Sequence, residues 1–86
     1  KDRGGQAYYY CKQYVEQSLS SPSTADFPFG DRAQQYQNQT YRASSYVDSQ
    51  NGFGAAIRSN WNCNIQYTGG DENNSENWKL VNLEFQ

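Results

Sequence analysis

The sequence predicts an α+β fold in which one N-terminal helix packs on a three- to four-stranded antiparallel sheet. Apolar residues recur at helical spacing near the start of the chain, apolar and polar residues alternate in its second half, and each pattern contains one cysteine. The 86 residues fit a single domain, residues 1–86, without an internal repeat. A core of this size often depends on a covalent link.

The expected helix covers residues 6–20. Its apolar side chains share one stripe, formed by Tyr8, Cys11, Val15 and Leu19, with Ala7 and Tyr14 beside it. In the segment SPSTADFP, residues 21–28, Pro22 lacks an amide hydrogen and biases Ser21 out of helical geometry. We therefore expect the helix to stop here, Ser21 to cap a short turn, and Phe27 to point inward beneath the helix.

The second half predicts strands joined by a hairpin. The clearest strand covers residues 55–67, where alternate residues from Ile57 to Tyr67 form the apolar face and the residues between them form a polar face. Apolar and polar residues also alternate, less regularly, over residues 41–48. The Asn51-Gly52 step, which can take positive φ, predicts the turn between these two strands. In the last strand, residues 78–85, the apolar face shifts by one near Leu80, which predicts a β-bulge or burial on both faces.

The two cysteines are predicted to form a disulfide. Cys11 lies on the apolar face of the helix and Cys63 on the apolar face of the strand, so both point into the same core if helix and sheet pack together. This pairing indicates an oxidising compartment, periplasmic or extracellular. Two unrelated buried thiols in a cytosolic protein are the alternative.

Composition argues against several functions. The 7 basic and 9 acidic residues are scattered and give a formal charge of −2, so nucleic acid is not an expected partner. Because the chain has no histidine and only two cysteines, we expect no zinc site of the usual type and no cofactor. No apolar run is long enough to span a bilayer, so any membrane tether would lie outside this chain. No serine is paired with a histidine base or a Ser-x-x-Lys motif, and we predict that the protein is not an enzyme.

Two regions are candidate contact surfaces. One is the hairpin at Asn51, Gly52 and Phe53, together with the exposed edge of the sheet. The other is the polar face of the long strand, where Arg58, Asn60 and Asn62 could bind a glycan or a peptide. A solvated sheet face without any ligand explains the second pattern more simply, because antiparallel sheets commonly leave one face in water.

Three stretches carry a resemblance to a known domain: CKQYVEQSLSSPSTADFP, YRASSYVDSQNGFGAAIRSNWNCNIQY and WKLVNLEF. Together they resemble a small uncharacterised bacterial extracytoplasmic domain that often follows a lipoprotein signal or membrane segment. The resemblance implies an envelope location and no particular activity. In architecture the chain is also similar to cystatin-type inhibitors, although it has Gln50-Asn51-Gly52-Phe53-Gly54 in place of their Gln-x-Val-x-Gly loop.

The function that these observations favour is a non-enzymatic, extracytoplasmic interaction module whose partner is another protein of the cell envelope. A module that binds a small glycan or peptide ligand is the alternative from a different class. Cystatin-like inhibition has only the fold analogy behind it.

Overall fold

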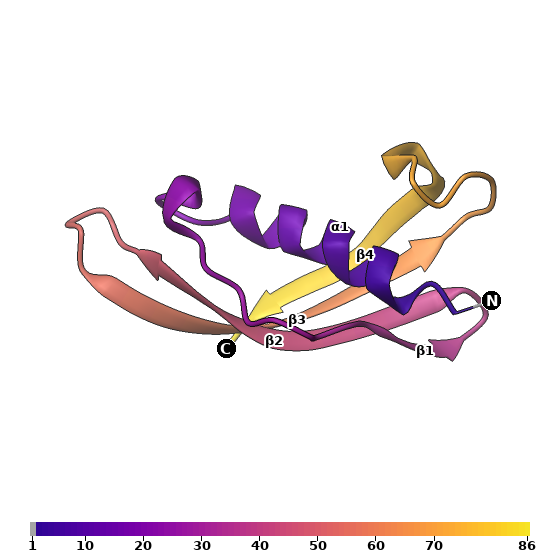
Figure 1. Cartoon of the computed structure of the whole chain (residues 1–86), viewed down its shortest axis with the longest axis horizontal. Coiled ribbons are helices and arrows are strands. Elements are labelled where there is room, and N and C mark those ends of the chain that lie inside the picture. Colours follow the sequence, from indigo (N-terminus) through magenta and orange to yellow (C-terminus); the bar gives the residue numbers. More distant parts are fainter. Residues whose placement is uncertain (1) are drawn as a thin grey trace.

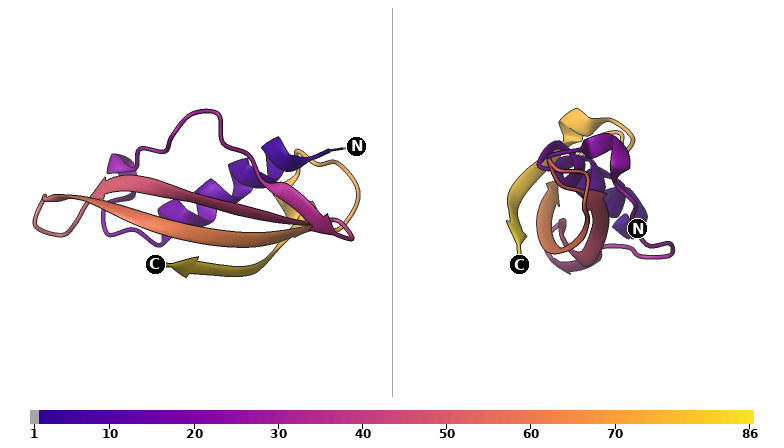
Figure 2. Two further views of the ribbon diagram at one scale, coloured as in Figure 1. Left: turned by 90° about the horizontal axis from the view of Figure 1, so that it is seen from below. Right: turned by 90° about the vertical axis from the view of Figure 1, so that its left-hand side faces the viewer.

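The computed structural model describes residues 2–86 and confirms one helix packed on an antiparallel sheet (Figure 1). The sheet has four strands in the order β1-β2-β3-β4, so each strand pairs with its neighbour in the sequence. The helix covers one face, and the opposite face is uncovered (Figure 2). The elements are α1 (Gly4–Gln17), η1 (Pro22–Thr24), β1 (Gln34–Gln37), β2 (Thr40–Gln50), β3 (Ala56–Tyr67), η2 (Ser75–Asn77) and β4 (Trp78–Phe85).

The β2–β3 hairpin is the longest part of the sheet. Its register runs without interruption from Thr40 opposite Gln66 to Gln50 opposite Ala56. The hairpin extends past the C-terminal end of α1, and the molecule measures 41 × 21 × 21 Å (Figure 1). Between β3 and β4 the register shifts after Asn64, which confirms the predicted irregularity near Leu80 as a bulge. The bulge leaves Val81 54% exposed on an edge strand.

The helix ends at Gln17, three residues before the end predicted from the sequence. It ends at Gln17 because the amides of Ser18 and Leu19 bond to carbonyls three residues back, which tightens the last turn. Its N-terminus begins at Gly4, whose amide donates to the Asp2 carboxylate at 2.8 Å. No helix among residues 2–86 combines the length and the apolar character needed to cross a membrane.

The core lies between α1 and the inner sheet face and is rich in aromatic rings. Cys11 and Cys63 are fully buried in it and form the predicted disulfide. The expected stripe on the helix is largely confirmed, with Tyr14 and Leu19 only partly buried. The remaining buried apolar side chains come from α1, β2 and β3, from the first residue of β4 and from the loop before β1: Ala7, Tyr8, Tyr10, Val15, Ala33, Tyr41, Ala43, Val47, Trp61, Ile65, Tyr67 and Trp78.

The SPSTADFP segment forms a corner that is bonded to the sheet. Pro22 to Thr24 make a single 3-10 turn, and the amide of Thr24 donates to the Ser21 carbonyl. Ser21 makes no side-chain cap, contrary to the expectation, because the Thr24 amide that such a cap would bind donates to the Ser21 carbonyl at 3.0 Å instead. The Thr24 hydroxyl donates to the same carbonyl at 2.7 Å. Asp26 then pairs with Asp48 of β2 through two backbone hydrogen bonds, and Phe27 packs edge-on against Trp61. The segment therefore turns the chain and also covers part of the β2 edge.

Candidate functional site

The residues predicted to make contacts lie in two separate places. Asn51, Gly52 and Phe53 form the tip of the β2–β3 hairpin, and Arg58, Asn60 and Asn62 lie on the outer face of β3. The outer face is the uncovered side of the sheet, opposite α1 (Figure 2). The structure therefore supplies two candidate surfaces rather than one site.

The hairpin tip is held in one shape by the Asn51 side chain and backbone. The Asn51 Oδ1 atom accepts from the amides of Phe53 and Ala55 at 2.9 and 3.1 Å. The amide of Gly54 donates to the Asn51 carbonyl, and the amide of Asn51 donates to the Ala55 carbonyl. These four bonds fix the turn and leave the Phe53 side chain 98% exposed at its end.

The expectation that the Asn51-Gly52 step takes positive φ is wrong. Positive φ occurs in this turn at Gly54, whose φ is +81°. The loop between Gln50 and Ala56 is five residues long, and a loop longer than two residues commonly closes with a left-handed glycine at its end. Asn51 instead works through its side chain, as an acceptor for the amides inside the loop.

A groove lies next to the turn end of the hairpin, on the side of the sheet that carries α1. Its volume is about 230 Å³, and its apolar lining consists of Leu19, Ile57 and Phe85. Ile57 is 45% exposed and Phe85 43% exposed, because α1 ends before it reaches this part of the sheet. The inner face of β3 is therefore covered around Cys63 and open around Ile57.

On the outer face, Arg58 is bound by its own chain. Its guanidinium donates to both Asp48 carboxylate oxygens at 2.8 and 2.9 Å and lies 3.9 Å from the centre of the Tyr46 ring. The hydrogen bonds from Arg58 lower the pKa of the Asp48 carboxyl, and the same bonds raise the pKa of Arg58. Both groups stay ionised at neutral pH, as suits a cross-strand ion pair.

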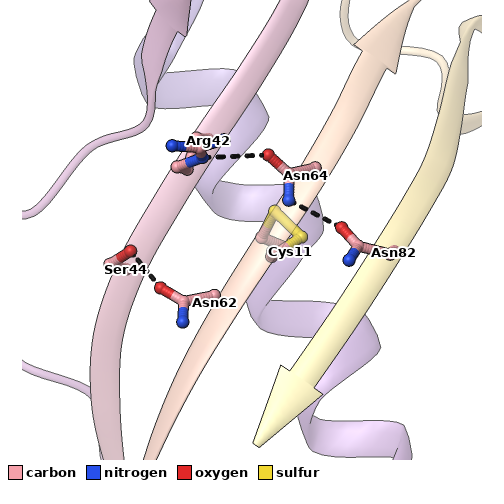
Figure 3. The surroundings of a disulfide bond; sticks show 7 residues. Cys11, Arg42, Ser44, Asn62, Asn64 and Asn82 are labelled. Carbon is pink, nitrogen blue, oxygen red and sulfur yellow. Dashed lines mark hydrogen bonds between the residues drawn. A yellow bond between two sulfur atoms is a disulfide. The ribbon is translucent and has the colours of Figure 1, made fainter.

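The two asparagines predicted with Arg58 differ in their surroundings. Asn62 accepts a hydrogen bond from the Ser44 hydroxyl on β2 (Figure 3). Asn60 is exposed and lies opposite Tyr46. The outer face near Arg58 is therefore a polar surface in which most side chains are bonded to their cross-strand neighbours.

A second row of side chains crosses the outer face and was not predicted as a site. Arg42 Nε donates to Asn64 Oδ1 at 3.2 Å, and Asn64 Nδ2 donates to Asn82 Oδ1 at 2.6 Å (Figure 3). The Arg42 guanidinium lies 4.7 Å from the centre of the Tyr36 ring. One side chain from each of the four strands thus takes part in this row.

The sequence held one signal for this row. In an uninterrupted hairpin, each step back along one strand matches one step forward along the other. Counting in this way from Gln50 opposite Ala56 places Arg42 opposite Asn64. Period-two alternation alone assigns both residues to the polar face without showing that they meet. The positions of Tyr36 and Asn82 could not be obtained in this way, because both outer strand pairs contain a register shift.

The exposed sheet edge was also predicted as a contact region. One edge of the sheet is β4, which pairs only with β3 among the strands of residues 2–86. On the other side, β1 pairs with the start of β2, and Asp26 pairs with β2 near its end. The longer open edge of the sheet therefore lies along β4, where the bulge at Val81 interrupts it, and the short strand β1 forms the other edge.

The fold and these surfaces define a small disulfide-linked α+β domain with an exposed hairpin and an uncovered polar sheet face. Among residues 2–86, no three His, Cys, Asp or Glu side chains gather as metal ligands would. Comparison with known proteins finds no matching family, no matching curated protein and no matching solved structure. The disulfide indicates a compartment outside the reducing cytoplasm.

Proposed function

We propose that this chain is a non-enzymatic interaction module that binds another protein of the cell envelope through the β2–β3 hairpin. The observation that carries the proposal is Phe53, an aromatic side chain 98% exposed on a turn fixed by four hydrogen bonds. Covering an exposed aromatic ring removes apolar surface from water and therefore favours binding of a partner. Aromatic anchors that are held rigid before binding lose little entropy when they enter a pocket.

A comparison with Phe29 shows that exposure alone does not distinguish Phe53, and that the ordered turn does. It is also fully exposed, at 101%, but it lies in a segment without regular structure before Gly30, whose φ is +83°. Phe53 instead projects from two long paired strands. The hairpin therefore presents its ring on a scaffold, which is the arrangement that a recognition loop needs.

The groove beside the hairpin adds apolar area to the same end of the molecule. Ile57 and Phe85 are both partly exposed there, and Leu19 lines the groove from the helix side. A partner that covered Phe53 and extended along the inner side of the hairpin would bury these side chains too. Such a surface has an aromatic anchor and an apolar flank, as protein interfaces commonly do.

The proposed location is the bacterial periplasm or the cell exterior. Support comes from the disulfide and from the resemblance to the small bacterial extracytoplasmic domain. Any tether to the membrane would be supplied by a segment outside this chain. The partner is then a protein of the envelope rather than a nucleic acid, in keeping with the scattered basic residues and the net charge of −2.

Site-specific crosslinking tests the proposal. A photoreactive phenylalanine analogue is placed at position 53 or, as the matched control, at position 29, and each protein is expressed in its source cells and irradiated. We expect one dominant adduct from position 53 and none of that size from position 29. The partner is then purified, and Phe53→Ala should weaken its binding by roughly tenfold or more, as truncation of an anchor residue does. Equal labelling at the two positions, or unchanged affinity of F53A, would contradict the proposal.

A further inference from the structure

The outer sheet face carries two arginines in similar surroundings, and only one of them has an acidic partner. Arg58 and Arg42 both lie over tyrosine rings, Tyr46 and Tyr36, at 3.9 and 4.7 Å. Arg58 is bound by both oxygens of Asp48. Within residues 2–86, Arg42 forms no ion pair, and its one side-chain hydrogen bond is the donation from Nε to Asn64.

The Arg42 guanidinium is therefore oriented but not neutralised. Its plane is held by the Tyr36 ring on one side and its Nε by Asn64, so the two terminal nitrogens remain available. A guanidinium with a fixed plane and a free pair of N–H donors matches a carboxylate, which accepts two parallel hydrogen bonds. Asp48 accepts two such bonds from Arg58 on the same sheet face, through Nε and one terminal nitrogen. On Arg42 the Nε donates to Asn64, so a carboxylate there would be bound by the two terminal nitrogens.

The surroundings of Arg42 form a shallow hollow of about 320 Å³. Its lining consists of Arg32, Gln34, Gln35, Tyr36, Arg42 and Ser44. Arg32 is paired with Asp2 at 3.0 Å, so Arg42 contributes the unbalanced positive charge. The rest of the lining is carboxamide, hydroxyl and aromatic, which suits a ligand rich in hydroxyl groups rather than one with apolar side chains.

We propose that Arg42, Tyr36 and Asn64 form a binding site for an acidic sugar, with the sugar carboxylate on the Arg42 guanidinium and its hydroxyls on the neighbouring amides. The row continues from Asn64 to Asn82, and crossing from β1 to β4 covers about 14 Å at the usual strand spacing. A short chain of sugars can therefore lie across the strands. This site is separate from the hairpin tip around Phe53, and its failure would leave the proposed function untouched.

Titration with trigalacturonate, followed by amide and arginine Nε NMR signals, tests the site. We expect saturable shifts at Arg42 Nε and at the Asn64 side-chain amide, with a dissociation constant in the millimolar range. The fully methyl-esterified trimer keeps the hydroxyls and loses the charge, and it should bind roughly tenfold more weakly or not at all. Added salt should also weaken binding of the acid, because the site is open to water.

Two substitutions on the same face separate a specific site from general attraction. Arg42→Gln should abolish the shifts, and Tyr36→Leu should weaken binding several-fold by releasing the guanidinium. Arg58→Gln is the matched control, because it removes the same charge about 20 Å further along the hairpin, and it should leave the affinity within about twofold. All three positions are exposed or half-exposed, and unchanged signals from core residues will confirm folding.

Three results would overturn the proposal. One is the lack of saturable shifts with trigalacturonate, and another is equal binding by R42Q and the unmodified chain. The third is tighter binding of triglutamate than of trigalacturonate, which would assign the site to acidic peptides instead of acidic sugars.

Discussion

The Cα atoms of Cys11 and Cys63 lie 6.0 Å apart, and their sulfur atoms are bonded at the middle of the helix–sheet interface (Figure 3). Their sequence separation is 52 residues, so the bond closes well over half of the chain into one loop. Neither cysteine is exposed to solvent. Helix and sheet are therefore joined covalently inside the core.

Removal of the disulfide should destabilise the domain strongly. A loop of this length restricts the unfolded chain by about 4 kcal/mol in the chain-entropy description. We expect the double variant Cys11→Ala/Cys63→Ala to lose about that much free energy of unfolding, measured by urea denaturation with circular dichroism. Adding a reductant should destabilise the unmodified chain and leave the double variant unchanged. A loss well below ~1 kcal/mol in the variant would show that the non-covalent core is sufficient.

Gly4 and Gly5 are adjacent in the helix but should respond in opposite ways to alanine. A Cβ atom built on Gly4 would lie 2.2 Å from the carbonyl oxygen of Ala33, whereas one on Gly5 would meet nothing within 4 Å. Gly4→Ala should therefore destabilise by about 1–3 kcal/mol through overpacking. Gly5→Ala should stabilise by about 0.5–1 kcal/mol, because alanine favours the helix. Thermal denaturation of the two variants checks this, and a shift in the same direction for both would contradict the close approach of Gly4 to Ala33.

Much of the fold follows from periodicity in the sequence. The strand expected at residues 55–67 corresponds to β3, Ala56–Tyr67, and its apolar side is buried from Trp61 onwards. The shift near Leu80 correctly marks a bulge. These features are local, because one buried face imposes a repeat of two residues on a strand and a repeat near 3.6 on a helix.

Apart from the disulfide, contacts between distant parts of the chain were not predicted. Tyr10 lies off the expected stripe, yet it is only 6% exposed because Trp78 from β4 packs beside it with ring centres 5.8 Å apart. The row through Arg42 depends on the register between strands. The alternation of apolar and polar residues along one strand carries no information about that register. The hairpin was predicted, but the glycine with positive φ was misplaced because the loop is longer than a two-residue turn.

Asn51 should control the order of the hairpin tip without affecting the core. Asn51→Ala removes the acceptor for the amides of Phe53 and Ala55, each bond contributing about 1 kcal/mol at most in this exposed loop. Amide hydrogen exchange should become faster at these two residues, while core amides and the melting temperature change little. Gln50→Ala is the matched control, because within residues 2–86 the Gln50 side chain makes no hydrogen bond and its amide donates to Thr24 Oγ1, a bond that alanine keeps.

The same variant bears on the proposed function. If a rigid turn presents Phe53, Asn51→Ala should weaken binding of the crosslinked partner although the aromatic ring is still present. Unchanged affinity in N51A together with faster exchange would show that the order of the turn is not needed for recognition.

The Asp48–Arg58 pair should make a pH-dependent contribution to stability. Arg58 lowers the pKa of Asp48 below its ordinary value of 3.8. A carboxyl with a lower pKa in the folded state binds fewer protons there than in the unfolded chain, so its contribution is complete above the unfolded pKa and is lost as pH falls through the folded pKa. We expect Asp48→Asn to lower the melting temperature at pH 7, and the gap from the unmodified chain to shrink progressively below pH 3.8.

The difference in melting temperature between the unmodified chain and Asp48→Asn separates the effect of Asp48 from that of Asp2, the other carboxyl whose pKa is shifted. The pKa of Asp2 is also lowered, chiefly by the amide of Gly4, and its contribution changes with pH in the same direction. Because Asp2 is present in both proteins, its effect cancels when their melting temperatures are subtracted. Both side chains of the Asp48–Arg58 pair are substantially exposed, so 1 M salt should also narrow the gap at pH 7. A gap that stayed constant from pH 7 to well below pH 3.8 would show that the Asp48 side chain stabilises the hairpin by a means other than its charge, since the backbone bridge to Asp26 is present in both proteins.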